Sequence, residues 1–293
     1  MDHFIHRQRL TVQWIAFAIP SVLVLFSSLF REQFADHPYI AFILLALALL
    51  LAFYLQVRVL RLDREGSYAQ KLSVYRFASK PKIVTGVFYE EHGSSTLTHV
   101  NQCDTRAAKL VESELAQVGF KTISTISCSD DDVSPKAFSS EDVILICGPV
   151  GNSLSRELNQ CLKDAGANAF YFSALEDAEQ TAHRPKGKAK WIISHGLFGD
   201  LRITHPNSGN DDYGVIFVGR NPKAKDLWLV WLAGLGAEGT IGAARALVDP
   251  HVQAHIAEQL RSNDFVSALV KWKYERWDRG KIDSVLFSPR LVR

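Results

Sequence analysis

Two glycine-containing loops, each placed directly after an apolar segment, have the residue types and spacing that suit ligand binding. Residues 148–153 read Gly-Pro-Val-Gly-Asn-Ser and follow the apolar residues 143–147. Residues 234–239 fit the pattern GxGxxG and follow the apolar residues 227–233. Glycines let backbone N–H groups approach a phosphate closely, and the amino end of a following helix adds partial positive charge. This pattern in this position predicts a site for an anionic small molecule.

The two loops supply the predicted ligand contacts. Asn152 and Ser153 offer side-chain hydrogen bonds to a ribose, a base or a phosphate, and Thr240 stands where a helix begins. A plain structural explanation stays open, because Asn152 would also cap a helix and the glycines would also allow close packing of a helix on a sheet. The predicted set is Gly148, Pro149, Gly151, Asn152, Ser153, Gly234, Gly236, Glu238, Gly239 and Thr240.

The second loop departs from a dinucleotide fingerprint in two ways. Its strand comes late in the chain, and no acidic residue follows at a strand end about 20 residues further on. Glu238 lies inside the loop and would repel a phosphate unless its side chain points away. If the protein is an enzyme, Glu238 is the candidate acid/base carboxylate, with Glu90 as a second choice.

Other groups of reactive residue types favour structural roles. His195 and His205, with Asp200 between them, match no standard metal spacing, and a run of acidic residues at 130–132 suits a solvated turn, so no metal site is predicted. Cys147 ends an apolar segment and is expected in the core. Trp272 and Tyr274, among basic residues, fit either a surface for headgroups or single strands, or an edge strand.

Alternating strand-like and helix-like segments position the loops. Strands are predicted at 82–89, 122–128, 143–147 and 169–172, and helices at 104–118 and 154–165, with Gly119 and Gly166 as helix stops. Asp104 or Thr105 is the expected cap of the first helix. Strand-helix units in series predict an α/β fold, a Rossmann-like domain with a mostly parallel sheet covered by helices on both faces.

The rest of residues 81–293 is predicted to complete this domain. Short strands at 191–194, 201–204 and 213–218 predict an antiparallel β extension, at about 185–222, packed on the sheet edge. The strand at 227–233 returns to the sheet, helices follow at 243–248 and 251–261, and segments 265–274 and 285–291 predict a closing hairpin.

The N-terminal region predicts a membrane hairpin at residues 1–57. Residues 10–30 and 38–57 carry no charged side chain, and each is long enough to cross a hydrocarbon core of about 30 Å as a helix. A cleaved signal peptide and a buried core helix are the alternatives, but no small-residue cleavage pattern follows the first segment. Residues 58–80 form a connector, which lies on anionic headgroups, transmits rotation from the cytosolic domain to the membrane segments, or is simply solvated.

Flanking charge orients this hairpin. Basic residues concentrate before residue 10 and after residue 57, whereas only Arg31 lies between the two segments, beside two acidic residues. Because basic residues stay on the cytoplasmic side, both termini are predicted inside the inner (cytoplasmic) membrane, with a cytosolic domain. The four cysteines form no CxxC pair, in keeping with a reducing compartment.

Charge balance argues against nucleic-acid binding. The first 80 residues carry 9 basic and 5 acidic side chains, and the remaining 213 carry 24 and 26. A slightly negative domain lacks the many cations that neutralise phosphates along a polyanion. We therefore expect no nucleic-acid partner.

The strand ending in residues 148–153 and the later strand ending in residues 234–240 resemble those of the broad Rossmann-like class of SLOG and related nucleotide-sensing or nucleotide-processing domains. In bacteria such domains are fused to paired membrane helices in effectors of nucleotide-signalling defence systems. Enzymatic members carry a Pro before the glycines and an acidic residue three positions after Gly-Thr, where this chain has Ala243. The resemblance therefore implies nucleotide binding more than hydrolysis.

Three hypotheses follow. The first is a membrane-anchored sensor or effector, expected as a homo-oligomer, that binds a nucleotide or a nucleotide-derived second messenger such as a cyclic nucleotide. Binding would change hairpin assembly or membrane integrity, as in bacterial antiphage defence. The second is a membrane-tethered enzyme acting on a nucleotide or on NAD. The third is a membrane scaffold whose α/β domain only docks a partner.

Overall fold

The computed structural model describes residues 38–78, 80–92, 95–120, 125–128, 140–174, 191–197, 199–204, 210–276 and 279–289. The chain divides into two compact units, residues 1–70 and 71–293. In the first unit the described residues form most of one helix, α2 (Pro38–Val74), whose last turn belongs to the second unit.

Helix α2 contains the second predicted membrane segment, residues 38–57. Several of its apolar side chains are exposed, among them Ile43, Leu50 and Phe53. In the described part of the chain, none of the helices combines the length and the apolar character needed to cross a membrane. Residues 10–30, the other half of the predicted hairpin, lie outside the described residues, so the hairpin stays a prediction.

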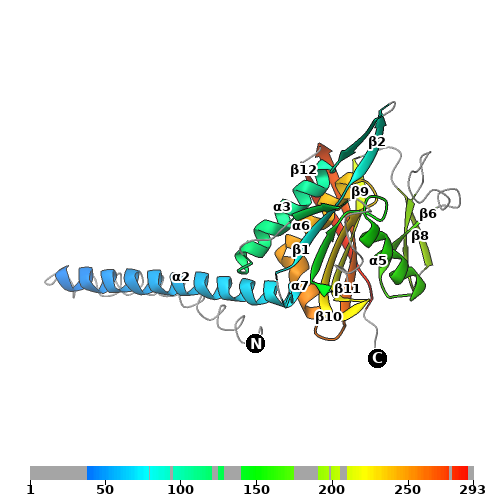
Figure 1. Cartoon of the computed structure of the whole chain (residues 1–293). Coiled ribbons are helices and arrows are strands. Elements are labelled where there is room, and N and C mark those ends of the chain that lie inside the picture. Colours follow the sequence, from blue (N-terminus) through cyan, green and yellow to red (C-terminus); the bar gives the residue numbers. More distant parts are fainter. Residues whose placement is uncertain are drawn as a thin grey trace. The chain divides into compact units, whose positions relative to one another are not determined.

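The second unit is an α/β domain built on a seven-stranded mixed sheet with the order β12-β11-β9-β10-β5-β1-β4 (Figure 1). Four strands form its parallel half: β1 (Lys82–Gly86), β4 (Thr125–Cys128), β5 (Val143–Ile146) and β10 (Ala224–Gly234). Three antiparallel strands extend it: β9 (Asp211–Asn221), β11 (Phe265–Arg276) and β12 (Arg279–Phe287). The α/β prediction is confirmed, and the sheet is mixed but mostly parallel, with four of its seven strands in the parallel part.

Both faces of this sheet are buried, which explains why its strands are apolar without alternation. In β5, Ile144 and Ile146 face one core, while Val143 and Leu145 face the other. The first core is covered by α3 (Gln102–Gln117), α6 (Ala237–Val248) and α7 (Pro250–Gln259), and the second by α5 (Ser153–Asp164) (Figure 1). The predicted two-sided helical cover is therefore present.

The strands of the predicted β extension belong to two different sheets. A separate antiparallel sheet holds β6 (Phe170–Ala174), β7 (Trp191–His195) and β8 (Gly199–Thr204), and it packs on the α5 side. The strand predicted at 169–172 thus lies outside the parallel sheet, and the one predicted at 213–218 is β9 of the central sheet. A further hairpin, β2 (Phe88–His92) and β3 (Ser95–His99), lies between β1 and α3.

Helix ends follow local chemistry. Gly119 and Gly166 have φ values of 95° and 52°, so both predicted stops adopt the left-handed conformation that glycine tolerates best. Asn101 caps α3 by accepting a 2.8 Å hydrogen bond from the N–H of Cys103, where Asp104 or Thr105 had been expected. The side chain of Asp104 therefore does not cap the helix. The predicted closing hairpin is confirmed by β11 and β12.

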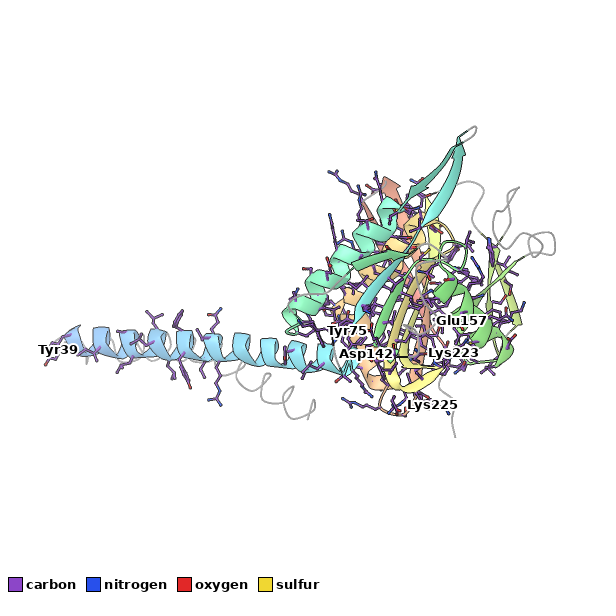
Figure 2. All side chains as sticks on the ribbon, in the orientation of Figure 1. Tyr39, Tyr75, Asp142, Glu157, Lys223 and Lys225 are labelled. Atoms are coloured by element: carbon purple, nitrogen blue, oxygen red, sulfur yellow. The ribbon has the colours of Figure 1, made fainter. Side chains whose placement is uncertain are left out.

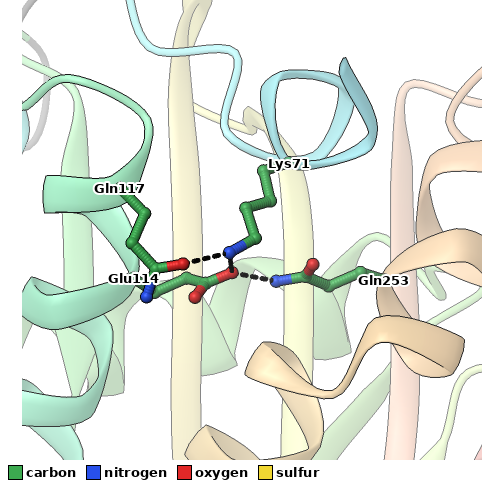
Figure 3. A network of polar contacts seen from close by, with 4 residues as sticks. All are labelled: Lys71, Glu114, Gln117 and Gln253. Carbon is green, nitrogen blue, oxygen red and sulfur yellow. Dashed lines mark hydrogen bonds and ion pairs between the residues drawn. The ribbon is translucent and has the colours of Figure 1, made fainter. Parts of the chain in front are cut away.

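The last turn of α2 is held by a polar network in the second unit. Lys71 Nζ lies 3.0 Å from Glu114 Oε1 and donates to Gln117 Oε1 at 2.6 Å, while Gln253 Nε2 donates to Glu114 Oε1 at 2.7 Å (Figure 3). Glu114 is 6% exposed. This buried charge joins α2 to α3 and α7 by directional contacts.

Two residues labelled in Figure 2 fix the chain directly after α2. Asp142 accepts hydrogen bonds of 2.7 Å from the backbone N–H groups of Ala78 and Trp228. Tyr75 is buried, and burial followed by the nearby charge of Glu114 raises the pKa of its hydroxyl well above the usual value. The chain directly after α2 is therefore held in place by burial and by hydrogen bonds.

Candidate functional site

The two glycine loops meet at one edge of the sheet. Strands β5 and β10 are parallel neighbours, with Ile146 paired to Leu232, so their carboxyl ends place the loops side by side. A Cβ built on Gly148 would lie 3.4 Å from the carbonyl oxygen of Gly234. The structure thus brings the two loops together, as a single ligand that contacts both of them requires.

This edge is also where the strand order reverses. From β1 the chain passes through α3 to β4 on one side, and then returns to β5 on the other side of β1. Helices α3 and α5 consequently cover opposite faces of the sheet, which leaves a crevice beyond the ends of β1 and β5. The N–H of Val87 donates to the carbonyl of Gly151 at 3.0 Å and ties the end of β1 to the first loop.

A pocket of about 160 Å³ occupies this crevice, and we call it the glycine-loop pocket. Six predicted residues line it: Gly148, Pro149, Gly151, Gly234, Gly236 and Thr240. Its lining does not include Asn152, Ser153, Glu238 or Gly239. The residues that sequence reasoning missed are Asn101, Asp104, Cys147, Val150, Phe172, Trp191, Leu235 and Ala237.

Asp104 is the ionisable carboxyl group of this pocket. It stands in the first turn of α3, is 3% exposed, and its Oδ2 has no hydrogen-bond partner among the described residues. Burial raises the pKa of Asp104 to about 7, although the side chains of Cys147 and Thr240 lower it by hydrogen bonding. At neutral pH this carboxyl is therefore poised to accept or to donate a hydrogen bond.

Cys147 lies beside Asp104 at the end of β5. Burial, reinforced by the charge of Asp104, raises the pKa of its thiol far above the usual value. A thiol that stays protonated is a poor nucleophile. The expectation that Cys147 is a packing residue agrees with these surroundings.

The backbone N–H groups of the second loop have an acceptor within the chain. The carboxylate of Asp212, which lies in β9, accepts from the N–H of Gly236 at 3.0 Å and from the N–H of Gly239 at 2.7 Å. It thus occupies the place at the amino end of α6 where a phosphate was predicted to bind. Asp212 is 1% exposed.

The first loop is capped in a similar way. Asn152 Oδ1 accepts hydrogen bonds from the N–H groups of Leu154 and Ser155 at 2.8 and 3.2 Å, and Asn152 Nδ2 donates to the carbonyl of Thr85 at 3.4 Å. The structural explanation considered for Asn152 is therefore the one that the geometry supports. The lining of the pocket includes the ring of Trp191 and the carboxyl group of Asp104, while the N–H groups of Gly236, Gly239, Leu154 and Ser155 have acceptors within the chain.

Several second-loop glycines are needed for close packing. A Cβ on Gly234 would collide with the backbone of Gly236 and Thr240, and a Cβ on Gly239 would collide with the carbonyl of Tyr213. A Cβ on Gly242 would overlap the ring of Trp272. Trp272 is itself 2% exposed, so it packs in the core and is not part of a binding surface.

The remaining candidates are placed as follows. Glu238 is buried beside Cys103, whose Sγ lies 3.9 Å from Glu238 Oε1. His195 is buried against the ring of Phe170, accepts from the N–H of Leu197 at Nδ1, and contacts Ser288 Oγ through Nε2 at 3.1 Å. Across the described residues, no three His, Cys, Asp or Glu side chains group closely enough to hold a metal. His205 and residues 130–132 lie outside the described residues.

No protein-family model matches the chain, and no curated protein matches it in sequence. The functional argument therefore depends on the fold and on the contents of the pocket.

Proposed function

We propose that the protein is a membrane-anchored sensor whose α/β domain binds the base of a nucleotide-type messenger in the glycine-loop pocket. The observation that carries this proposal is the meeting of the two loops across a pocket that also contains Asp104. Ligands of open α/β sheets bind at such a crevice, where the strand order reverses.

The size of the pocket favours the base over the whole nucleotide. A volume of about 160 Å³ is below the roughly 300–1000 Å³ of pockets that enclose a complete small ligand. Trp191 lines the pocket, is half-buried, and provides aromatic surface for stacking, which contributes about 1–3 kcal/mol per base in other systems. Phe172 also lines the pocket but is 2% exposed and packs against Trp231. The sugar and phosphates would then extend outward, away from the buried acid.

Asp104 supplies the polar recognition of this base. A neutral carboxyl both donates and accepts a hydrogen bond, and an ionised carboxyl accepts two. A planar edge that carries a donor and an acceptor, such as that of a nucleobase, would satisfy the Asp104 oxygen that has no partner among the described residues. A phosphate in the same position would be repelled by the ionised form.

Helix α3 connects this pocket to the last turn of α2. Asp104 lies in its first turn, and Glu114 and Gln117, which hold Lys71, lie ten and thirteen residues later, about 15–20 Å along the helix. A ligand that shifts the first turn of α3 would therefore also move Glu114 and Gln117, which contact Lys71 in the last turn of α2. To change the state of the hairpin from 1:99 to 99:1, the ligand must favour one state by about 5.5 kcal/mol.

The membrane part of the proposal depends on two uncharged segments, residues 10–30 and 38–57. In this account they form a hairpin in the inner membrane with both termini cytoplasmic, and ligand binding changes how copies of the hairpin assemble. A role of this kind would suit an effector of antiviral defence.

The test is calorimetric titration of the full chain in detergent micelles. The ligands are the four common ribonucleosides, their 5′-monophosphates, NAD, and cyclic dinucleotides. We expect binding by one class of base, about tenfold weaker in Trp191→Ala and near wild type in Trp191→Phe. Leu197→Ala is the control, because Leu197 is exposed and does not line the pocket.

Gly148→Val provides a second, steric test, since the added side chain would narrow the gap between the loops. Its binding should be lost while its melting temperature stays close to that of the wild type. Titrations with no heat from any ligand in the panel, or binding unaffected by both substitutions, would overturn the proposal. Recovery of the ligand unchanged after incubation separates a sensor from an enzyme acting on a nucleotide or on NAD.

A further inference from the structure

A second and larger cavity lies near the other end of β10. It has a volume of about 310 Å³, and its lining includes Trp228 and Phe265. Trp228 precedes Gly234 by six residues, which is about 20 Å along a strand. This cavity is therefore separate from the glycine-loop pocket.

Cationic side chains dominate this second cavity, which we call the arginine pocket. Arg76, Arg220 and Arg261 line it, and Asp264 is the carboxylate among its described lining residues. Asp264 lies 3.8 Å from Arg220 and is largely exposed, so it offsets part of one charge. The charge of Arg76, together with the part of the Arg220 charge that Asp264 does not offset, leaves an excess of positive charge in a concave site.

Arg76 has the geometry of a guanidinium held ready for a ligand. Its Cζ lies over the ring of Trp228, 5.4 Å from the ring centroid, and its Nε donates to the carbonyl of Ser73 at 2.9 Å. Within the described residues, the contacts of the Arg76 side chain are this ring contact and this backbone hydrogen bond. The stacking and the single backbone bond fix its plane and leave its terminal nitrogens available.

The charge of Arg220 acts on Arg76 from across the cavity. Burial, followed by repulsion from Arg220, lowers the pKa of Arg76. Arg220 contacts Asp264 and donates from Nη1 to the carbonyl of Lys225 at 2.7 Å, so its charge is only partly offset. An anion between Arg76 and Arg220 would reduce the repulsion between the two guanidinium groups. Both guanidinium groups are exposed, so water screens part of this repulsion, and a bound anion would remove the rest.

The carbonyl of Gln259, at the neighbouring end of α7, has hydrogen-bond donors within the chain. Helix carboxyl ends expose carbonyl oxygens that would repel an anion. Here the carbonyl of Gln259 accepts from the backbone N–H groups of Ser262 and Asn263, each at 3.2 Å, and from Asn263 Nδ2 at 2.9 Å. This carbonyl is therefore satisfied within the chain.

We propose that the arginine pocket binds the phosphate group of a phosphorylated ligand of up to nucleotide size. Arginine is the side chain best matched to phosphate oxygens, because its planar fork donates two parallel hydrogen bonds. A cavity of about 310 Å³ has room for a phosphate with a sugar attached. The inference is independent of what binds between the glycine loops.

The phosphate has two possible sources, a water-soluble ligand or a lipid headgroup. Helix α2 continues for 17 residues beyond residue 57, the end of the proposed membrane segment, which is about 26 Å of helix. A helix of this length separates the pocket in sequence from the headgroups and favours the soluble source.

The experiment titrates the full chain in nanodiscs of phosphatidylcholine with inorganic phosphate and with ribose 5-phosphate, at constant ionic strength maintained with chloride. Ribose without phosphate is the negative ligand. We expect saturable binding of both phosphates, weakened at least tenfold in Arg76→Gln and in Arg220→Gln. Arg245→Gln is the matched control, because Arg245 is exposed on α6 and lies outside the cavity lining.

A second set of nanodiscs contains phosphatidic acid. If a lipid headgroup is the natural ligand, phosphatidic acid should prevent the wild type from binding ribose 5-phosphate. The weak binding of ribose 5-phosphate by Arg220→Gln should then be the same in both kinds of disc. If the ligand is soluble, titrations in both kinds of disc should agree. The melting temperature in chloride alone shows whether each variant is folded. No difference between phosphate and chloride, or equal weakening in Arg245→Gln, would overturn the proposal.

Discussion

The carboxylate of Asp212 accepts a 2.7 Å hydrogen bond from the backbone N–H of Gly239, at the amino end of α6. The same carboxylate accepts from the N–H groups of Gly236 and Tyr213. A side chain from a neighbouring strand thus takes the position that a phosphate occupies in many glycine-rich loops. This relationship shifts the expected ligand contacts away from the loop amides and toward Asp104 and the aromatic rings.

Replacing Asp212 with Ala should destabilise the domain strongly. Three N–H groups would lose a charged acceptor in a buried place, which we expect to lower the free energy of unfolding by about 3 kcal/mol. Asp212→Asn keeps one acceptor oxygen, so its free energy of unfolding should lie between those of the wild type and Asp212→Ala. Urea unfolding followed by tryptophan fluorescence measures this, and a loss below 1 kcal/mol in Asp212→Ala would contradict the assigned role.

The stability of the domain should fall as pH rises from about 4 to about 7 because of Asp104. Its pKa is raised from 3.8 to about 7 on folding, so in this window the folded protein holds a proton that the unfolded chain releases. A pKa difference of about three units corresponds to about 4 kcal/mol in the free energy of unfolding, and this contribution is fully lost above pH 7. Asp104→Asn should remove this slope and be more stable than the wild type at pH 8.

The control for this pH series is Asp226→Asn, because Asp226 is an exposed residue of β10. Unfolding curves collected between pH 4 and pH 8 should keep the wild-type slope in Asp226→Asn. If Asp104→Asn shows the same slope as the wild type, then Asp104 is not the group that titrates.

Breaking the Lys71–Glu114 pair from one side should be costly. Lys71→Met leaves the buried Glu114 carboxylate with Gln253 but without its cation, and we expect a loss of about 3–5 kcal/mol. The double variant Lys71→Met with Glu114→Gln should recover part of this loss. A thermodynamic cycle measures the coupling, with the exposed α3 variant Lys109→Met as a control. Additive effects would mean that the contact does not link α2 to α3.

Two glycine substitutions should separate packing from binding. Gly234→Ala places a methyl group against the backbone of α6 and should cost about 1–3 kcal/mol of stability. In Gly148→Ala the methyl group meets the carbonyl of Gly234 at an ordinary contact distance, so the loss should stay below about 1 kcal/mol. Melting temperatures compare the two, and equal losses would show that both loops serve packing alone.

The sequence allowed the central sheet and the meeting of the loops to be predicted, for identifiable reasons. Residues 143–146 are apolar on both faces, which few structures other than a central parallel strand require. Gly119 and Gly166 stand directly after amphipathic helices and end them. These signals are local, so a single sequence reveals them.

The contents of the site could not be predicted, because they depend on contacts between distant parts of the chain. Asp212 precedes Gly236 by 24 residues and reaches it only because β9 pairs with β10 in antiparallel order. Strand β9 had been expected in the extension, where its alternation fitted equally well. Trp191 reaches the pocket from a separate sheet, and Asp104 was taken for a helix cap that Asn101 provides instead.

The most direct test of the central claim is hydrogen–deuterium exchange of the full chain in micelles, with and without the nucleoside and nucleotide panel at millimolar concentration. The account predicts slower exchange in peptides that cover residues 148–152, residues 234–237 and the first turn of α3, with no such change in Gly148→Val. Slower exchange confined to other peptides, or no change with any ligand of the panel, would contradict the claim that a base binds between the two loops.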